Sequence, residues 1–342
     1  MKIAIVGAGA IGGWLGAKLA AARHCDLSVL ARGATLAALR QNGWRLQASE
    51  GSIGCPARAS DDPSHLGKQD LIIVAVKGPA LASVVAAVQA MMHEDTAVMP
   101  AMNGVPWWFA EASPLADRRP LRALDADGAI AVALPASRVI GCVVHTSAMS
   151  LAPGVVRLQM GNRLVVGEAI GEAVGGLSER VHAVARLLVD AGIDVTTSSS
   201  IRNDIWYKLW GNLTMNPVSA ITGATVDRLL DDPLVTQFCS DAMREADEIG
   251  RRIGIVMDQS PEERHQVTRK LGAFKTSMLQ DVDAARPVEL DSIVGAVYEL
   301  GQRTGVPTPN IAALLGLARL FARVRGVYPM KDPMKDPMRE GA

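Results

Sequence analysis

The chain has 342 residues, about twice the usual size of one domain, so we expect two domains, each with its own hydrophobic core. Hydrophobic residues make up 49% of the sequence and charged residues 20%, which is typical of a globular protein and excludes a disordered chain. The 35 basic residues balance the 35 acidic ones, and no lysine and arginine cluster points to nucleic acid or an anionic membrane as a partner.

The four cysteines are far apart and form no CxxC pair, so we expect reduced thiols. The six histidines lack the spacing of metal ligands, and we expect no metal site. No apolar run approaches the roughly 18 to 20 residues that cross a bilayer. Met1-Lys2 leads directly into a strand pattern rather than into a signal peptide, so we expect a cytoplasmic protein.

Short β-rich runs alternate with helical stretches from Lys2 to about Ser200, a pattern typical of an α/β domain with a parallel sheet. The predicted strands are Lys2–Val6, Asp26–Ala31, Asp70–Val76, Ala97–Ala101, Val139–Ser147, Val155–Gly167 and Asp194–Thr197. The predicted helices between them are Ile11–Ala22, Ala34–Gln41, Pro79–Met91 and Leu177–Asp190. Residues 1–199 are therefore predicted to form the first domain.

The strand signal disappears after Ser200, and apolar residues then recur at helical spacing. The predicted helices are Trp206–Val218, Pro233–Ile253, Pro261–Leu279, Pro287–Arg303 and Asn310–Arg325. Residues 200–328 are thus predicted to form an all-helical domain. The tail 329–342 repeats a Lys-Asp-Pro-Met unit, and we expect it to be disordered.

A glycine motif, Gly7-Ala8-Gly9-Ala10-Ile11-Gly12, follows the first predicted strand and opens the first predicted helix. In this context Gly7 permits a tight turn, Gly9 lets the backbone approach a pyrophosphate, and Gly12 lets the helix pack closely on the strand. The helix N-terminus adds free N–H groups and a partial positive charge. The motif therefore predicts a Rossmann-type dinucleotide site, rather than a glycine-rich turn that merely packs.

The end of the second predicted strand indicates which dinucleotide binds. Sites for NAD place an Asp or Glu there, about 20 residues after the glycines, where it accepts hydrogen bonds from the ribose. Here the sequence reads Leu30-Ala31-Arg32-Gly33, without a carboxylate, and Arg32 would pair with a 2′-phosphate. We therefore expect NADPH; the alternative is that Arg32 is a solvated residue after a strand.

Two further polar residues follow predicted strands of the first domain. Lys77 comes directly after Leu71–Val76, and Asn103 comes shortly after Ala97–Ala101. Because open α/β sheets bind ligands at the carboxyl ends of their strands, both residues are candidates for the site. The alternatives are an exposed lysine and a simple Asn-Gly turn.

Lys208, Asn212 and Asn216 follow one another at intervals of four residues and so share one face of a predicted helix. Burying these polar groups in an otherwise apolar segment would be costly unless they met a polar ligand. The alternative is a solvated stripe above packed aromatic residues. Glu289, near the start of a predicted helix, and Ser277 have purely structural interpretations on local sequence alone.

The order and spacing of these segments resemble the ketopantoate reductase family, the 2-dehydropantoate 2-reductases of pantothenate and coenzyme A biosynthesis. The resemblance covers nearly the whole chain and implies a Rossmann domain followed by a helical domain, with the site in the cleft between them. The matching segments are Lys2–Gly13, Val76-Lys77, Asn103-Gly104-Val105, Pro153-Gly154-Val155-Val156, Trp206-Tyr207-Lys208-Leu209 through Asn212 to Asn216-Pro217, and Thr276–Asp281 through Glu289.

The resemblance also implies roles for individual residues. Lys208 matches the general acid that protonates the oxygen formed as hydride reaches the ketone carbon. Asn103 matches a residue that touches both nicotinamide and substrate, and Lys77 matches one that contacts the cofactor. Glu289 matches a carboxylate that helps to hold the cofactor and to order the site. The substrate-binding positions of the family match Asn212, Asn216 and Ser277.

Three departures from the family affect the predicted substrate pocket. Met102 stands where the family often has Gln, and Arg157-Leu158-Gln159 lacks the histidine often found after Gly-Val-Val. The pair Trp107-Trp108 occurs in only part of the family. We expect NADPH-dependent reduction of a small 2-oxo acid, 2-dehydropantoate to (R)-pantoate, by a monomer or homodimer. One alternative is an NAD-dependent D-2-hydroxy acid dehydrogenase of the mandelate type, which Arg32 disfavours. The other is a catalytically silent NADPH-sensing protein, which would have no need of the proton donor Lys208.

Overall fold

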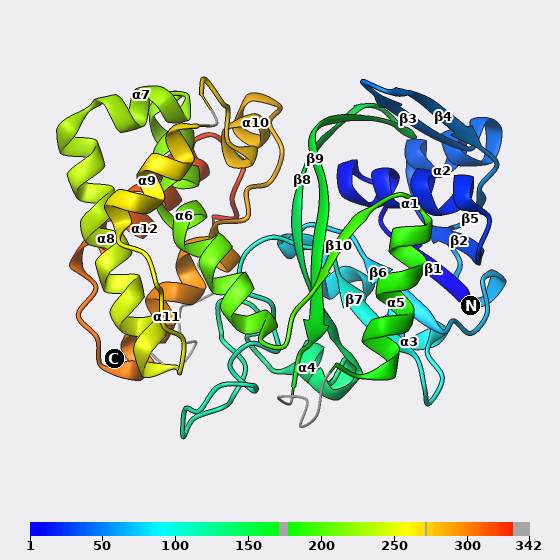
Figure 1. Cartoon of the computed structure of the whole chain (residues 1–342), viewed down its shortest axis with the longest axis horizontal. Helices are drawn as coiled ribbons and strands as arrows, with labels where there is room; N and C mark the ends of the chain where they lie inside the picture. The colour runs from blue at the N-terminus through cyan, green and yellow to red at the C-terminus, as the bar shows by residue number, and fades with distance from the viewer. Residues whose placement is uncertain (171–176, 271, 331–342) are drawn as a thin grey trace. The chain divides into compact units, whose positions relative to one another are not determined.

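The structure of the protein, a computed structural model, describes residues 1–170, 177–270 and 272–330. Unit 1 of the chain comprises Met1–Met102 and Ile130–Asp204, and unit 2 comprises Asn103–Ala129 and Ile205–Ala342 (Figure 1). The sequence pattern places residues 103–129 in the N-terminal domain, whereas in the structure they pack with the helical unit. The tail predicted to be disordered comprises residues 329–342, and its residues from 331 onward lie outside the described part of the chain.

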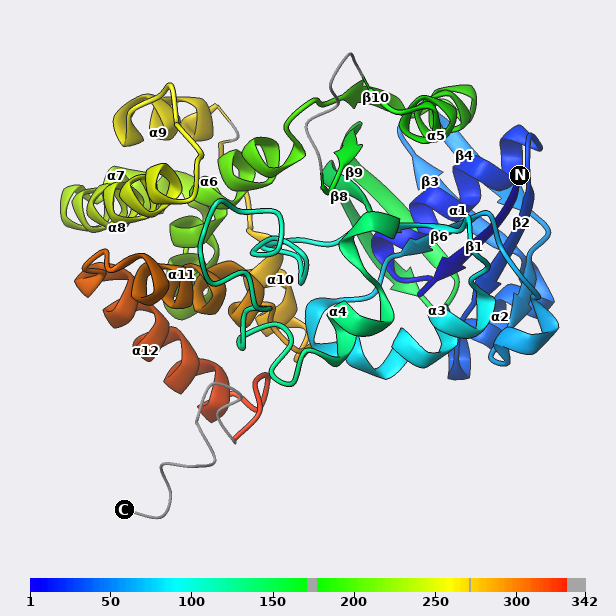
Figure 2. The ribbon, with the colours of Figure 1, turned by 90° about the horizontal axis from the view of Figure 1, so that it is seen from below.

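Unit 1 contains a five-stranded parallel sheet with the strand order β5-β2-β1-β6-β7 (Figure 1), of which β2, β1 and β6 are labelled in Figure 2. Its strands are β1 (Lys2–Val6), β2 (Asp26–Leu30), β5 (Arg58–Ser60), β6 (Leu71–Val74) and β7 (Ala97–Pro100). The residues of β6 and of the edge strand β7 are buried throughout, which indicates that this part of the sheet is covered on both faces. The chain crosses from one side of β1 to the other after β5, so the carboxyl ends of β1 and β6 border the crevice where such sheets bind ligands.

A second, mixed sheet in unit 1 has the order β10-β9-β3-β4, with β8 paired to β9. Its strands are β3 (Trp44–Ala48), β4 (Gly51–Cys55), β8 (Ile140–Ala152), β9 (Val155–Glu168) and β10 (Asp194–Thr197). The placement of Val139–Ser147 and Val155–Gly167 in one parallel sheet is wrong, because β8 and β9 form an antiparallel hairpin. Only Pro153-Gly154 connects them, which is far too short for the crossover that parallel neighbours require. The sequence analysis did not predict β3, β4 or β5.

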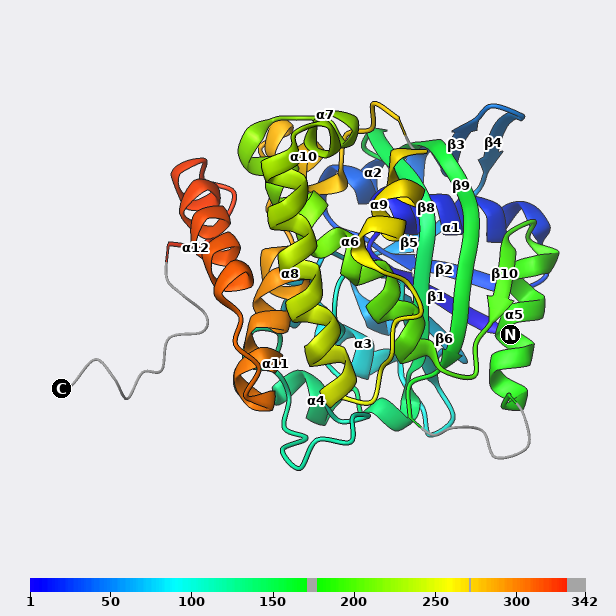
Figure 3. The same cartoon turned by 60° about the vertical axis from the view of Figure 1, so that its left-hand side comes forward.

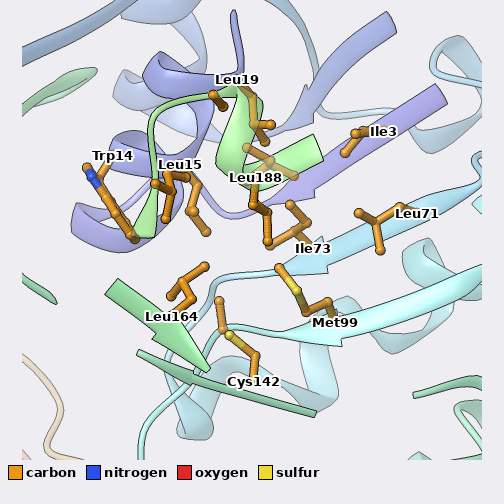
Figure 4. Close-up of a cluster of buried hydrophobic side chains, with 14 of the residues drawn as sticks. Ile3, Trp14, Leu15, Leu19, Leu71, Ile73, Met99, Cys142, Leu164 and Leu188 are labelled. Carbon is orange, nitrogen blue, oxygen red and sulfur yellow. The ribbon is translucent and has the colours of Figure 1, made fainter. Parts of the chain in front are cut away.

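Helix α1 (Ala10–Ala22) packs against strands of both sheets, contacting β1 and β2 as well as β3, β4, β8 and β9. A Cβ atom on Gly16 would lie 2.2 Å from the ring of Trp44 on β3, so the missing side chain permits this approach. Figure 4 shows the resulting core, where Trp14, Leu15 and Leu19 of α1 gather with side chains of both sheets. The core therefore fixes the first turn of α1 beside the ends of the parallel strands.

The other helices of unit 1 are shorter. Their bounds are α2 (Gly33–Asn42), α3 (Val85–Met91) and α5 (Glu179–Asp190); α4 (Ala129–Ala133) lies at the boundary with unit 2. The predicted helix Pro79–Met91 is wrong in its first half, which forms 3₁₀ turns at Gly78–Ala80 and Ala82–Val84. The hydroxyl of Ser83 donates to the carbonyl of Ala80 at 2.8 Å, a local bond that competes with the α-helical pattern.

Unit 2 is helical, and its described residues contain no strand. Its elements are α6 (Ile201–Thr222, beginning in unit 1), α7 (Val226–Asp231), α8 (Pro233–Arg252), α9 (Pro261–Arg269), α10 (Ser277–Asp283), a π-helical segment (Asp291–Gly295), α11 (Ala296–Thr304) and α12 (Pro309–Val324). Helix α8 contacts α7, α9, α11 and α12 (Figure 3). The Rossmann-like domain and the all-helical domain of the predicted fold class are thereby confirmed.

Two predicted helices of unit 2 are divided in the structure. Pro261–Leu279 is wrong as one helix, because α10 starts anew at Thr276, whose hydroxyl accepts a hydrogen bond from the N–H of Leu279 at 3.2 Å. Pro287–Arg303 begins instead with the π-helical segment, in which the backbone widens by one residue per turn. Both irregularities lie near residues that the sequence analysis assigned to the site.

Residues 103–129 are held to α11 by a buried carboxylate. Glu299 accepts hydrogen bonds from the N–H groups of Arg122 and Ala123 at 2.9 Å each, and from Arg303 Nη2 at 2.7 Å. The guanidinium of Arg303 also donates to two carbonyl groups of the segment, at 2.6 and 2.7 Å. Because unpaired buried backbone amides are costly, this pairing ties an otherwise irregular segment to the helical unit.

The structure contains four free cysteines, two buried and two half-buried. Burial raises the pKa of the Cys239 thiol to about 11, so this group stays protonated at neutral pH. Within the described ranges, no group of three or more His, Cys, Asp and Glu side chains could hold a metal ion. None of the described helices is both long and apolar enough to cross a membrane.

A buried histidine on α9 makes the stability of unit 2 dependent on pH. His265 is 5% exposed, and neither of its ring nitrogens has a hydrogen-bond partner among the described residues. Burial lowers the pKa of His265, the charges of Arg244, Arg264 and Arg269 act in the same direction, and Glu262 opposes them. The contribution of neutral His265 is fully present above the unfolded-state pKa near 6.5 and is lost as the pH falls through the folded-state pKa.

We predict that replacing His265 with Leu will reduce the loss of stability on acidification. Between pH 7 and pH 5, the wild-type protein should lose more unfolding free energy than the His265→Leu variant, because in the wild-type protein His265 must take up a proton on unfolding. Urea denaturation at both pH values measures the difference. Equal losses in the two proteins would contradict the assignment.

Candidate functional site

The carboxyl ends of β1, β2 and β6 border a pocket of about 470 Å³ in unit 1, a volume typical of small-molecule sites. The glycine loop lines this pocket, together with the end of β2 and with Val76, which lies two residues after the end of β6. The lining residues are Val6, Gly7, Ala8, Gly9, Leu30, Ala31, Arg32, Thr35, Val76, Ala80, Ser83, Val84, Ser150, Leu151, Ala152, Pro153 and Gly154.

The three motif glycines have distinct surroundings. Gly7 has a φ of +92°, and a Cβ on Gly12 would lie 1.9 Å from the carbonyl oxygen of Gly7, so a side chain at Gly12 would push α1 off the loop. Gly9 differs, because no atom lies within 4 Å of the position of its Cβ. No side chain caps the N-terminus of α1 at Gly9, which leaves the N–H groups of the first turn available to an anion. These residues fit the pyrophosphate of a dinucleotide.

Arg32 lies at the pocket wall, at the residue that precedes α2. Its side chain is exposed, and its Nη2 donates to the carbonyl oxygen of Ser83 at 3.2 Å. The carbonyl is neutral, so the positive charge of Arg32 is not cancelled by this contact. Since none of the lining residues is Asp or Glu, the pocket has the charge that suits an additional phosphate.

The other residues predicted for the cofactor are not among those that line this pocket. Ala10, Ile11 and Gly12 form the first turn of α1. Lys77 is half-buried and follows Val76, directly before the 3₁₀ turn Gly78–Ala80. Asn103 and Glu289 belong to unit 2.

The tip of the β8–β9 hairpin forms a wall of the pocket that was not predicted from the sequence. Residues Ser150–Gly154 form the tip of the β8–β9 hairpin, and a Cβ on Gly154 would lie 3.1 Å from Ala38 of α2. The segment Pro153-Gly154 had been matched to the family, but no role was assigned to it. Its place depends on the length and register of β8 and β9, which no local pattern reveals. Thr35 was also missed, although its position three residues after Arg32 is a usable signal.

In unit 2, the predicted general acid Lys208 contacts Asn103, which was predicted to bind cofactor and substrate. Lys208 Nζ donates a hydrogen bond to Asn103 Oδ1 at 2.7 Å, and both side chains are half-buried. Helix α6 carries Lys208 together with Asn212 and Asn216, and the last of these is only 4% exposed. The Nδ2 group of Asn216 has no hydrogen-bond partner among the described residues, a deficit that costs about 1–3 kcal/mol. This face of α6 therefore offers a donor to a polar ligand.

The turn that carries Asn103 is seated on the π-helical segment. Gly104 has a φ of +80°, and a Cβ there would lie 2.5 Å from the carbonyl oxygen of Ser292. The N–H of Val105 donates to the same oxygen at 2.7 Å. The hydroxyl of Ser292 in turn donates to the carbonyl of Glu289 at 3.4 Å, so the backbone of buried Glu289 is linked to the Asn103 turn.

Ser277 was predicted to contact the substrate, and Trp107-Trp108 to affect the substrate pocket. Ser277 is the exposed first residue of α10, and in the described part of the chain its side chain forms no hydrogen bond to the other candidate residues. Trp107 and Trp108 are 2% and 0% exposed, so both belong to the core. The neighbouring Phe109 stacks on Trp206 with ring centroids 5.9 Å apart, which packs the segment onto α6.

The glycine loop yields a paired prediction about stability. Gly12→Ala should lower the unfolding free energy by at least about 2 kcal/mol, because its Cβ would overlap the carbonyl of Gly7. Gly9→Ala should change it by less than about 1 kcal/mol, because open space surrounds that position. Urea unfolding of both variants measures the contrast, and two variants of equal stability would refute the described loop geometry.

Comparison with known proteins gives extensive matches. A 2-dehydropantoate 2-reductase of Mesorhizobium japonicum is 41% identical over 330 residues, which cover 96% of this chain and 100% of that protein. A solved structure from Ralstonia solanacearum MolK2, assigned to the ketopantoate reductases, is 51% identical with a TM-score of 0.91, covering 96% of this chain and 99% of that one. A D-mandelate dehydrogenase bound to NADH and anilino(oxo)acetate shares the fold, with a TM-score of 0.80 at 21% identity over 96% of this chain and 100% of that one.

Two family models match most of the chain. The model described as ketopantoate reductase PanE/ApbA matches residues 3–171, and the model of the ketopantoate reductase PanE/ApbA C terminal matches residues 200–322. These matches confirm the resemblance seen in the sequence. The chain therefore belongs to the ketopantoate reductase family of oxidoreductases.

Proposed function

We propose that the protein is an NADPH-dependent 2-dehydropantoate 2-reductase, which reduces 2-dehydropantoate to (R)-pantoate in pantothenate and coenzyme A biosynthesis. The observation that carries this proposal is the hydrogen bond between Lys208 and Asn103. The same face of α6 carries Asn216, whose Nδ2 has no hydrogen-bond partner in the part of the chain that the structure describes. The name of the Mesorhizobium japonicum relative supports the choice of substrate. The reaction class follows from the family.

The pocket in unit 1 supports a nicotinamide dinucleotide as the cofactor. The glycine loop and the uncapped N-terminus of α1 would hold the pyrophosphate, with Lys77, Asn103 and Glu289 as further contacts implied by the family. Arg32 supports NADPH over NADH, since it supplies a cation at the pocket wall and the lining residues include no carboxylate for the ribose. When bound, NADPH supplies the hydride for the C2 carbon of the substrate.

Lys208 is the proposed proton donor. Its Nζ would transfer a proton to the ketone oxygen as C2 is reduced, and its positive charge would stabilise the developing alkoxide. The amide oxygen of Asn103, 2.7 Å away, holds the ammonium group in one direction and so reduces the cost of orienting it. Asn212, Asn216 and Ser277 are the proposed substrate contacts.

Two other functions lead to different results in the same assay. A mandelate-type dehydrogenase would use NAD and an aromatic 2-oxo acid. It is tested as an alternative because a D-mandelate dehydrogenase shares the fold of this chain. A silent NADPH sensor would bind the cofactor and reduce nothing. Oxidation of NADPH and of NADH, measured with 2-dehydropantoate and a panel of other 2-oxo acids, separates the three. Faster turnover of NADH with an aromatic oxo acid would overturn our proposal.

The location and the assembly of the protein stay predictions. We expect it in the cytoplasm, acting on a small 2-oxo acid as a monomer or a homodimer. Gel filtration with light scattering measures the assembly directly.

Removing the lysine tests the proton donor. Lys208→Ala should reduce kcat for 2-dehydropantoate by at least about 100-fold, the usual contribution of a general acid. The Kd for NADPH, measured by fluorescence titration, should change much less. Lys270→Ala provides the control, because Lys270 is an exposed cation at the end of α9. Near-normal turnover of Lys208→Ala would reject this role.

Reversing the charge at the pocket wall tests the cofactor preference. Arg32→Asp should raise the KM for NADPH by at least about 10-fold while leaving the KM for NADH unchanged or lower, because a carboxylate repels a 2′-phosphate and accepts hydrogen bonds from a ribose. Arg40→Asp, in the helix that follows Arg32 and outside the pocket lining, is the matched control. An equal effect of Arg32→Asp on both cofactors would show that Arg32 does not select between them.

A further inference from the structure

A second cation lies against helix α6, beside the predicted catalytic face. Arg264 of α9 has its Cζ atom 4.6 Å from the centroid of the Tyr207 ring. The hydroxyl of Tyr207 donates to Gln259 Oε1 at 3.0 Å, which fixes the ring beneath the guanidinium. The guanidinium is therefore held in a defined position on the surface of α6.

The absence of a side chain on α6 makes room for this arginine. A Cβ added to Gly211 would lie 3.1 Å from Nη2 and 3.3 Å from Nε of Arg264, closer than most contacts of such atoms. Gly211 is buried, and glycine inside a helix lowers helix stability relative to alanine. Glycine at position 211 therefore leaves space for the guanidinium of Arg264, at the cost of a lower helix propensity than alanine would give.

The charge of Arg264 is not cancelled by a neighbouring carboxylate. Other arginines of this region are paired, Arg244 with Asp241 and Glu262, and Arg269 with Asp231. Among the residues that the structure describes, Arg264 forms no ion pair, and its buried Nε has no hydrogen-bond partner. A partly buried guanidinium without these partners is costly in a protein that binds no anion there.

The place of Arg264 relative to Lys208 follows from helix geometry. Gly211 comes three residues after Lys208, so the two positions are separated by about 60° around the α6 axis and by less than one turn along it. The guanidinium over Gly211 and the ammonium group of Lys208 thus flank the same part of the helix surface. A 2-oxo acid carries its carboxylate on the carbon next to the ketone, which requires two adjacent polar contacts of this kind.

We propose that Arg264 binds the carboxylate of the 2-oxo acid whose ketone oxygen receives its proton from Lys208. The inference rests on the proposed function and adds a residue that determines specificity for acids over neutral ketones. The planar guanidinium presents parallel N–H groups to both oxygens of a carboxylate, a geometry that lysine does not offer. The contact with the Tyr207 ring holds the guanidinium in place before the substrate arrives.

The test compares a charged and a neutral substrate. In Arg264→Gln, the KM for 2-dehydropantoate should rise at least about 10-fold, as expected for the loss of a charge-assisted contact, while kcat changes less. The KM for the lactone of 2-dehydropantoate, which has the ketone but no carboxylate, should stay within about 3-fold of the wild-type value. Lys270→Gln, which removes one exposed positive charge from the end of the same helix, should behave as wild type with both.

A second variant moves the guanidinium without removing its charge. Gly211→Ala places a Cβ against Nη2 and Nε, so the KM for 2-dehydropantoate should rise by a few-fold to about 10-fold with the lactone unaffected. Alanine has the higher helix propensity, so a weaker affinity in this variant would not come from a less stable α6. Thermal unfolding of both variants verifies that they fold.

The outcomes are distinct. A KM for 2-dehydropantoate that is unchanged in Arg264→Gln would overturn the inference, and equal increases for acid and lactone would show that Arg264 only packs on Tyr207. If the wild-type protein reduces no 2-oxo acid, the proposed function fails, and calorimetric titration with 2-dehydropantoate decides about Arg264 separately. Binding to the wild type but not to Arg264→Gln would support the carboxylate site, and no binding to the wild type would overturn it.

Discussion

The carboxylate of Glu299 pairs with two backbone N–H groups of the segment 103–129, and the arrangement around Asn103 depends on this buried contact. The segment has little regular structure of its own, so its position comes from such side-chain bonds and from the stacking of Phe109 on Trp206. Once it is held there, the Asn103 turn can rest on the carbonyl of Ser292 and reach the ammonium group of Lys208. Contacts of Glu299 and Phe109 thus help to bring Asn103 to Lys208, although neither of these residues is proposed to touch the substrate.

Close packing plays the corresponding part in unit 1. Helix α1 lies against strands of both sheets, and its glycines allow distances that any side chain would prevent. The same packing fixes the first turn of α1 directly after the glycine loop that lines the pocket. The hairpin tip Ser150–Gly154 closes another wall, so the pocket combines the parallel sheet with an element of the mixed sheet. A dinucleotide site of this form needs both sheets, although the glycine motif belongs to only one.

Each unit contains an arginine whose positive charge is proposed to bind an anionic ligand, Arg32 in unit 1 and Arg264 in unit 2. The chain as a whole has no net charge, yet neither Arg32 nor Arg264 forms an ion pair within the described residues. Each is instead oriented by a neutral group, a carbonyl for Arg32 and an aromatic ring for Arg264. Such contacts hold a cation in place without neutralising it. Both arginines therefore keep their charge for an anionic ligand, as the proposed phosphate and carboxylate contacts require.

The sequence by itself determined the features that arise from residues close together in the chain. The glycine loop follows from a strand, a turn and a helix within a dozen residues, and the shared face of Lys208, Asn212 and Asn216 follows from the helical period. Only the tertiary structure decided that β8 and β9 form a separate hairpin, that residues 103–129 pack with unit 2, and that Arg264 rests on Gly211. The last two features depend on contacts between segments tens of residues apart or more, and the hairpin depends on the extension of β8 to Ala152, beyond its predicted end at Ser147. Local patterns fix which elements form, but the fit between their surfaces fixes which of them meet.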